Sequence, residues 1–136
     1  MSQTATSKIL YIDDDSDDCY FLSHSLSESG TNADLVCATD AEEAINYLDT
    51  AAPSDLPSLI ILDLNMPKWD GRKTLMHLKK QPHLSGIPVI ILSTSENKKD
   101  KDACALLGAL SYFKKPFHFD GYKEIINSFI PLLNIS

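Results

Sequence analysis

The chain has 136 residues, a formal net charge of −7 and a hydrophobic fraction of 43%, which suits one folded domain with a hydrophobic core. An acidic chain without a strong basic cluster is a poor candidate for direct binding to nucleic acid. No apolar stretch approaches the ~20 residues that a membrane-spanning helix needs, and the first ten residues lack the pattern of a secretory signal. We therefore expect a cytoplasmic protein that contacts neither nucleic acid nor membrane.

The cysteines give no sign of a disulfide framework or a zinc site. Cys19, Cys37 and Cys104 are odd in number, lie far apart in the sequence and include no CxxC pair. We expect all three to be reduced residues in or near the core, because free cysteine behaves as a small apolar side chain. Reduced thiols also agree with the cytoplasmic location expected above.

Short apolar runs that favour strands alternate along the chain with stretches of helical periodicity. The expected strands are Ile9–Ile12, Ala33–Ala38, Leu59–Leu62, Pro88–Leu92 and Ser111–Phe113. These runs are apolar at nearly every position, as in strands that are buried on both faces. Strict alternation of strand and helix predicts an α/β fold, in which helices cover both faces of a parallel sheet.

Apolar residues at helical spacing mark the five helices between and after these strands. They are Cys19, Leu22 and Leu26; Ala44, Ile45 and Leu48; Leu75 and Leu78; Cys104, Leu106 and Leu107; and Tyr122, Ile125, Ile126 and Phe129. Asp40 and Glu43 form a capping pair for the second helix. Gly30 and Gly108 are expected to stop the first and fourth helices, and Pro131 to end or kink the last.

Polar side chains follow four of the expected strands at the point where each ends. Asp13–Asp15 follow the first strand and Asp63 the third, while Ser93 and Thr94 follow the fourth and Lys114, Lys115 and Pro116 the fifth. Because the carboxyl ends of parallel strands share one edge, where ligands bind, these groups should converge. Clustered carboxylates repel unless a cation neutralises them, and oxygen ligands with room for water favour Mg²⁺. An aspartate nucleophile, a metal ion and charge-neutralising donors are the parts needed for phosphoryl transfer.

Four motifs resemble the receiver domains of response regulators in two-component signalling, and the chain is similar to the single-domain chemotaxis regulator. They are YIDDD at 11–15, LDLNMPKWDG at 62–71, PVIILSTS at 88–95 and YFKKPF at 112–117. The resemblance implies a flavodoxin-like doubly wound (βα)5 fold with strand order 2-1-3-4-5. It implies one receiver domain over residues 1–136, with a core from about 8 to 133 and no output domain. The pattern at 62–72 also resembles regulators paired with phytochrome kinases.

The resemblance implies a metal and phosphoacceptor role for each matching acid. Asp63 would accept a phosphoryl group from a kinase histidine. Asp13 and Asp14, taken as the acidic pair because they directly follow the first strand, would bind Mg²⁺, Asp14 directly and Asp13 through water. Asp63 and the backbone carbonyl of Asn65 would be further metal ligands. Ser16, Asp17 and Asp18 are expected to be only the polar start of a helix.

The resemblance also implies how the phosphorylated state is stabilised and sensed. Lys115, which directly precedes Pro116, would contact the phosphoryl group, and the Lys115–Pro116 bond would be cis. Ser93 would be the switch hydroxyl, and Tyr112 the aromatic side chain that changes rotamer with it. The donor would be a sensor histidine kinase or a histidine phosphotransfer protein. A downstream protein target and a phosphorylation-dependent homodimer, through the fourth and fifth helices, are expected in addition.

Two other functions compete with this phosphoacceptor, which would have at most weak self-dephosphorylation and would not be an enzyme. A haloacid-dehalogenase-like phosphatase would use Asp13 and Asp15, but Ser16 and Asp17 do not match that family's pattern and the chain has no room for a cap. A receiver that binds partners without phosphorylation is the third hypothesis. Trp69 is expected in a half-exposed loop, with a partner contact as the alternative, and Phe117 and Phe119 either in the core or on an interaction surface.

Overall fold

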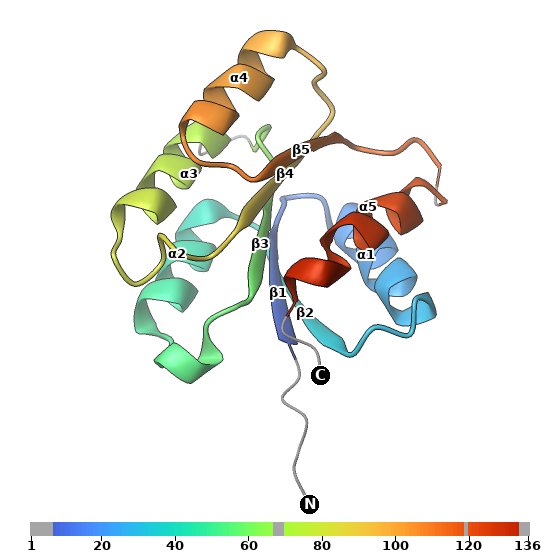
Figure 1. The fold of residues 1–136 in the computed structure, drawn as a ribbon, viewed down its shortest axis with the longest axis horizontal. Coiled ribbons are helices and arrows are strands. Elements are labelled where there is room, and N and C mark those ends of the chain that lie inside the picture. Colours follow the sequence, from blue (N-terminus) through green and yellow to red (C-terminus); the bar gives the residue numbers. More distant parts are fainter. Residues whose placement is uncertain (1–6, 67–69, 119, 134–136) are drawn as a thin grey trace, which may run out of the picture.

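A five-stranded parallel sheet forms the centre of the molecule, as the computed structural model shows for residues 7–66, 70–118 and 120–133 (Figure 1). The strands are β1 (Ser7–Ile12), β2 (Ala33–Ala38), β3 (Leu59–Leu62), β4 (Val89–Ser93) and β5 (Ser111–Lys114). Their order is β2-β1-β3-β4-β5. Both the α/β class and the expected strand order are therefore confirmed.

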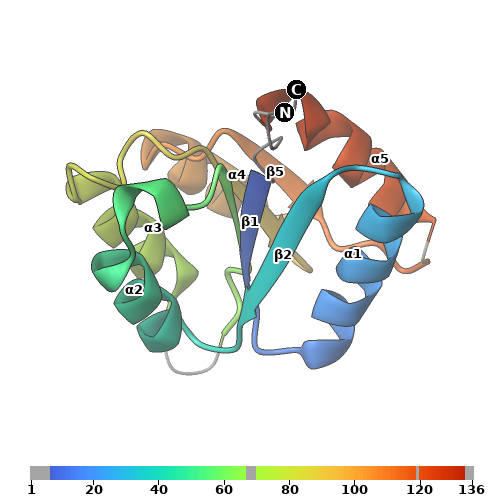
Figure 2. The same ribbon diagram turned by 90° about the horizontal axis from the view of Figure 1, so that it is seen from below.

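Five helices cover the two faces of this sheet. They are α1 (Ser16–Glu28), α2 (Ala41–Thr50), α3 (Gly71–Lys80), α4 (Lys98–Leu106) and α5 (Gly121–Phe129), with short 3₁₀ turns at Pro53–Asp55 and Ile130–Leu132. Figure 2 shows α1 and α5 on one side of the sheet and α2, α3 and α4 on the other. None of the helices in the described ranges is both long and apolar enough to cross a bilayer.

The two faces of each central strand belong to two separate hydrophobic cores. In β1, Leu10 and Ile12 pack with residues of α2, α3 and α4, whereas Ile9 and Tyr11 pack with residues of α1 and α5. Successive side chains of a strand point to opposite faces, so a strand that is covered on both sides must be apolar at every position. This burial explains why the strand sequences do not alternate between apolar and polar residues.

Two strands extend further toward the polar edge than their apolar runs suggested. β4 begins at Val89 rather than Pro88 and includes Ser93, while β5 includes Lys114. Pairing of Ser93 with Lys114 closes the ladder between these strands. Hydrogen bonding of the backbone continues regardless of side-chain polarity, so a strand can include a site residue at its end.

The helix ends follow the expected signals. The Asp40 carboxylate accepts a hydrogen bond from the Glu43 backbone N–H over 2.7 Å at the start of α2. Gly30 and Gly108 have φ values of 73° and 103°, the left-handed region that favours glycine where a helix stops. Pro131 lies in the 3₁₀ turn that follows α5. The capping and stop residues identified in the sequence therefore set the lengths of these helices.

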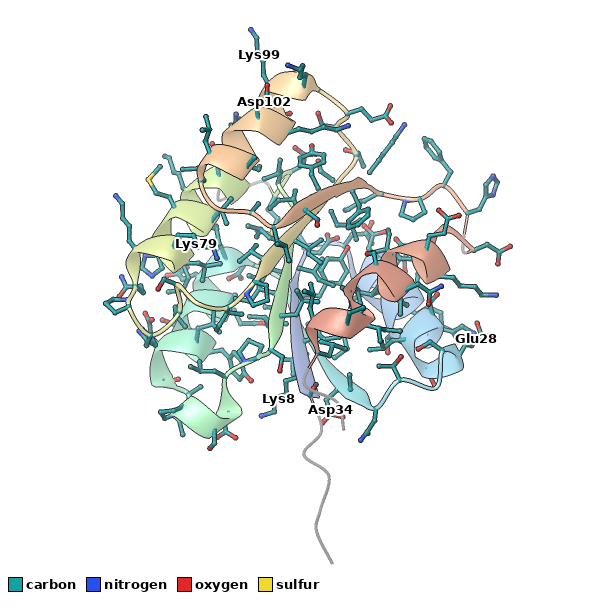
Figure 3. All side chains as sticks on the ribbon, in the orientation of Figure 1. Lys8, Glu28, Asp34, Lys79, Lys99 and Asp102 are labelled. Atoms are coloured by element: carbon teal, nitrogen blue, oxygen red, sulfur yellow. A yellow bond between two sulfur atoms is a disulfide. The ribbon has the colours of Figure 1, made fainter. Side chains whose placement is uncertain are left out.

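The polar side of α4 carries a short group of lysines at the start of the helix. Lys98 and Lys99 are exposed, and Figure 3 shows Lys99 and Asp102 projecting outward from this helix. Leu106, which helical spacing grouped with the core residues, is 89% exposed. Cys104 takes the buried position of this turn instead, so only part of the apolar pattern of α4 faces the sheet.

The expectation that all three cysteines are reduced is wrong for two of them. Cys19 of α1 and Cys37 of β2 form a disulfide with a Cα–Cα distance of 6.4 Å, while Cys104 is free and buried. The two bonded residues lie 18 positions apart in the sequence. They meet because α1 packs against β2, the edge strand of the sheet. The number and spacing of the cysteines in the sequence did not reveal this contact.

Candidate functional site

Three carboxylates meet at the edge of the sheet where β1 and β3 end. Asp13 follows β1 and Asp63 follows β3, and these neighbouring strands pair Ile12 with Leu62. The backbone N–H of Asp63 donates to the carbonyl oxygen of Ile12 over 3.0 Å, which fixes the start of the loop. Carboxylate oxygens of Asp13, Asp14 and Asp63 all lie within 4.8 Å of one another. The fold thus brings together the three acids to which the sequence pointed.

Asp13 and Asp63 are each only 2% exposed, so their carboxylates need partners within the protein. Asp13 accepts a hydrogen bond from the Tyr11 hydroxyl over 2.6 Å at one oxygen and from the Asp15 backbone N–H over 2.9 Å at the other. Asp63 accepts one from the Asn65 backbone N–H over 3.1 Å. These bonds orient both carboxylates before any ligand arrives.

The ammonium group of Lys115 is shared by three carboxylates. Its Nζ lies 2.7 Å from Asp18, 2.9 Å from Asp13 and 3.3 Å from Asp63. The Lys115 backbone N–H donates to the Ser93 carbonyl oxygen over 2.7 Å, which anchors the residue directly after β5. One ammonium faces three acids, so the cluster keeps an excess of negative charge.

This imbalance perturbs the ionisation of the site. Burial raises the pKa of Asp63 to about 6; the charge of Asp13 adds to the rise, while the Asn65 backbone N–H and Lys115 oppose it. Burial alone lowers the pKa of Lys115, but hydrogen bonds to Asp18 and Asp13 and the charge of Asp63 raise it above its ordinary value. Lys115 is therefore a permanent positive charge, whereas Asp63 ionises fully only near neutral pH.

Asn65 links the loop after β3 to the loop after β4. Its side-chain amide donates to Ser93 Oγ over 3.1 Å and to Thr94 Oγ1 over 3.1 Å. Ser93 is fully buried, and its Oγ also accepts from the Ser95 backbone N–H over 3.1 Å. The sequence singled out Ser93 and the carbonyl of Asn65, but this bridge by the Asn65 side chain was not foreseen.

Tyr112 of β5 is tied to the same loop after β4. Its hydroxyl donates to the Ser95 carbonyl oxygen over 2.8 Å, and its ring packs against the core beneath α4. Ser95 Oγ in turn donates to Asp100 of α4 over 2.8 Å, and the guanidinium of Arg72 in α3 lies 3.3 Å from Asp100. A displacement of this loop would therefore change the contacts that it makes with Tyr112 and α4, and through Asp100 the contact with α3.

The donor set fits a hard divalent cation. Asp13, Asp14 and Asp63 offer three carboxylates at one point, and such oxygen ligands suit Mg²⁺ and Mn²⁺. A divalent charge would offset the excess of carboxylates that a single lysine leaves. The sequence therefore predicted a metal centre at an edge where the structure gathers ligands of the right chemistry.

Asp18 is the site residue that the sequence analysis missed. It was interpreted only as the polar start of a helix, yet it makes the shortest of the three contacts to Lys115. Its other oxygen lies 3.5 Å from the hydroxyl of Tyr122, which is buried in α5. Burial raises the pKa of Asp18, while its hydrogen bond to Lys115 opposes that rise. The sequence feature that could have identified Asp18 as a site residue is its position in the first turn of α1, the helix that follows β1 and the acids at its end.

Some expectations on this edge are wrong or lie outside the described residues. No cis peptide bond occurs in the described ranges, so the Lys115–Pro116 bond is trans, the isomer that X–Pro bonds prefer by default. Phe117 is 87% exposed, so of its two alternatives, the core or an interaction surface, the core is excluded. Trp69 and Phe119 both lie outside the described residues, as does Pro67 of the motif at 62–71.

Comparison with known proteins gives a consistent match. The family model for the response regulator receiver domain covers residues 9–127. The chain is 36% identical over 110 residues to response regulator Rcp1 of Synechocystis sp., an alignment that covers 79% of this chain and 75% of Rcp1.

Solved structures agree with the sequence comparison. The phosphorylated cyanobacterial phytochrome response regulator RcpA superposes with a TM-score of 0.82 at 33% identity, covering 91% of each chain. The Mn²⁺-bound form of Rcp1 superposes with a TM-score of 0.83 at 29% identity, covering 96% of this chain and 99% of that one. Of these two relatives, RcpA is phosphorylated and Rcp1 has a divalent metal bound.

Proposed function

The chain belongs to the response regulator receiver domain family, and from this premise we propose that Asp63 accepts a phosphoryl group from a histidine of a partner protein. The observation that carries the proposal is the placement of Asp63. Its carboxylate is buried at the end of β3, 3.3 Å from the Lys115 ammonium and grouped with the oxygens of Asp13 and Asp14. A nucleophile, a cation site and a fixed positive charge thus meet at one point.

The residues of the site would divide the work of phosphoryl transfer. An oxygen of ionised Asp63 attacks phosphorus and forms a P–O bond while the P–N bond to the donor histidine breaks, so the electron pair of that bond returns to the imidazole. Lys115 donates a hydrogen bond to a phosphoryl oxygen while the phosphoryl group passes from the imidazole to Asp63. Mg²⁺, held by Asp13, Asp14, Asp63 and the Asn65 carbonyl, would neutralise charge on the phosphoryl oxygens and lower their repulsion by the carboxylates.

The loop after β4 supplies a route from phosphorylation to a change in surface. The Ser93 hydroxyl now accepts a hydrogen bond from Asn65, and a phosphoryl group on Asp63 would offer it an acceptor instead. Movement of Ser93 would strain the bond between Tyr112 and the Ser95 carbonyl, so Tyr112 is the side chain expected to change rotamer. The response would then be a different protein-binding surface near α4.

The partners follow from this chemistry. The donor is a sensor histidine kinase or a histidine phosphotransfer protein, and likeness to RcpA makes a phytochrome kinase the first to test. A downstream protein in the cytoplasm would bind one state better than the other. A homodimer through α4 and α5 that forms on phosphorylation is a finer part of the proposal; light scattering that finds only monomer in both states would remove it.

The alternative phosphatase gains no support from the site. That chemistry needs Asp15 as acid and base, but the Asp15 carboxylate accepts a hydrogen bond from the Asp17 backbone N–H over 2.9 Å and caps α1. Asp15 is exposed and does not share the ammonium of Lys115 with Asp13, Asp18 and Asp63.

Intact-mass spectrometry tests the proposal directly. The chain is incubated with Mg²⁺ and a small acyl phosphate, with Asp63→Asn and a metal-free sample as controls. We expect one phosphoryl adduct that is absent from both controls. Steady release of phosphate that survives Asp63→Asn and fails in Asp13→Asn would instead indicate a phosphatase. Absence of both adduct and release would leave a binding module.

A further inference from the structure

The first turn of α1 carries an acid to which no role in phosphoryl transfer has been given above. Asp18 lies two residues after the start of the helix, and its Oδ2 is 2.7 Å from the Nζ of Lys115. This distance is shorter than those from Nζ to Asp13 and Asp63, at 2.9 and 3.3 Å. The lysine is therefore held most closely by a residue outside the predicted phosphoacceptor and metal ligands.

Asp18 differs from the other two partners of Lys115 because it is not part of the candidate cation site. Asp13 and Asp63 belong to the group of oxygens that could hold a cation, and Asp18 does not. A cation bound to Asp13 and Asp63 would compete with Lys115 for the oxygens of these two carboxylates. Asp18 is the partner that stays committed to the lysine when the cation site is filled.

A lysine needs such an anchor if it is to act at a fixed point. Its four-carbon side chain is flexible, and holding it in one rotamer costs conformational entropy. Asp18 offers a carboxylate from a helical turn, a rigid support, and both side chains are largely buried, with 18% and 12% exposed. Without it, Nζ would be free to close onto Asp63 and to cover the oxygen that must attack phosphorus.

We propose that Asp18 is a positioning residue that holds the Lys115 ammonium beside Asp63, near enough to meet a phosphoryl oxygen but not closed onto the nucleophile. The inference rests on the proposed function of Asp63 as phosphoacceptor. Asp18 touches neither the phosphoryl donor nor the metal in this scheme, so its whole effect passes through Lys115.

The chain provides a matched control for this role. Asp17 is the other acid in the first turn of α1 and is exposed. Asp17→Asn and Asp18→Asn remove the same charge at nearly the same distance from the helix start, so both change the helix dipole and the net charge alike. Only Asp18→Asn weakens the contact with Lys115. A difference between the two variants therefore reports on the lysine.

The rate of phosphorylation by a small acyl phosphate in saturating Mg²⁺ is the main measurement. We expect Asp18→Asn to be slower than Asp17→Asn by about tenfold, less than the 10²–10³ lost with a donor that touches the reacting group, because Asp18 acts through Lys115. Asp18→Glu restores the charge on a longer side chain and should recover to within about threefold of the unsubstituted protein.

Two further measurements exclude a purely structural effect. The Mg²⁺ affinity, followed by the fluorescence of the single tryptophan, should agree within about twofold between Asp17→Asn and Asp18→Asn, since neither acid is a ligand. Their thermal unfolding should also coincide. A slow Asp18→Asn with lowered Mg²⁺ affinity or lowered stability would overturn the inference, as would equal phosphorylation rates in the two variants or an Asp18→Glu that stays as slow as Asp18→Asn.

The same experiment keeps the inference separate from the function on which it rests. If the unsubstituted protein forms no adduct at Asp63, the phosphoacceptor function itself fails. If it forms the adduct and Asp18→Asn matches Asp17→Asn, the function stands and the positioning role of Asp18 is refuted.

Discussion

Reduction of the Cys19–Cys37 disulfide is expected to lower the thermal stability of the protein. The bond closes a loop over a sequence separation of 18 and joins α1 to the edge strand β2. A crosslink restricts the unfolded chain, and breaking it restores entropy to the unfolded state. The perturbation needs no substitution, because a phosphine reductant converts the same protein from one free thiol to three.

The expected magnitude follows from the length of the loop. For a separation of 18 residues the chain-entropy relation gives about 11 cal/mol/K, or roughly 3 kcal/mol at 25 °C. An unfolding entropy near 2.1 cal/mol/K per residue gives about 290 cal/mol/K for the 136 residues. The ratio predicts a fall in Tm of about 11 °C on reduction.

Circular dichroism melts with and without reductant measure this shift, and thiol counting confirms that the bond is open. The double variant Cys19→Ser/Cys37→Ser is the control: its Tm should resemble that of the reduced protein and should not respond to reductant. A fully reduced sample that melts within about 2 °C of the oxidised one would refute the loop-entropy reasoning.

Two further predictions concern the loop that carries Asp63. Because burial raises the pKa of Asp63 from 3.8 to about 6, its folded state prefers the protonated acid, and the stability from that proton is lost as pH rises through this window. In the absence of divalent cations, Asp63→Asn should therefore be more stable than the unsubstituted protein by about 3 kcal/mol near pH 7.5, and by less than about 1 kcal/mol near pH 4; denaturation curves that differ by the same amount at both pH values would contradict this. Gly71→Ala would place a Cβ 2.5 Å from Leu64 Cα and 2.9 Å from the Asp63 carbonyl oxygen, so it should lose about 1–3 kcal/mol in urea denaturation and slow phosphorylation, whereas the control Gly86→Ala, with no neighbour within 4 Å, should change neither.

The features that the sequence predicted are those that depend on local pattern. The apolar run Leu59–Leu62 coincides with β3 because a strand covered on both faces must be apolar throughout. The run Ala33–Ala38 coincides with the edge strand β2, which is less buried and includes the exposed Asp34. Asp63 stood out because a charge at the end of a buried run must have a partner or a ligand. Its burial and its neighbours agree with that reading.

The features that the sequence did not predict depend on contacts between distant segments. Asp18 lies 97 positions from Lys115, and only the tertiary fold, which places the start of α1 near the residue that follows β5, brings them together. The approach of Cys19 to Cys37 has the same origin. An acid in a first helical turn and a cysteine with no nearby partner each have an ordinary local explanation, so local pattern had no means to separate these residues from their neighbours.

The placement of Lys115 directly after the last strand has a consequence for synthesis on the ribosome. Lys115 follows Asp63 by 52 positions, a delay of roughly 3 to 10 s at 5–20 residues per second. During that interval Asp13, Asp18 and Asp63 have already emerged, but the ammonium that they share has not. In a nascent sheet of β1, β2 and β3, these acids would therefore repel one another unless a cation from solution binds between them. The repulsion is offset by the protein itself only when β5 docks and brings the Lys115 ammonium into place.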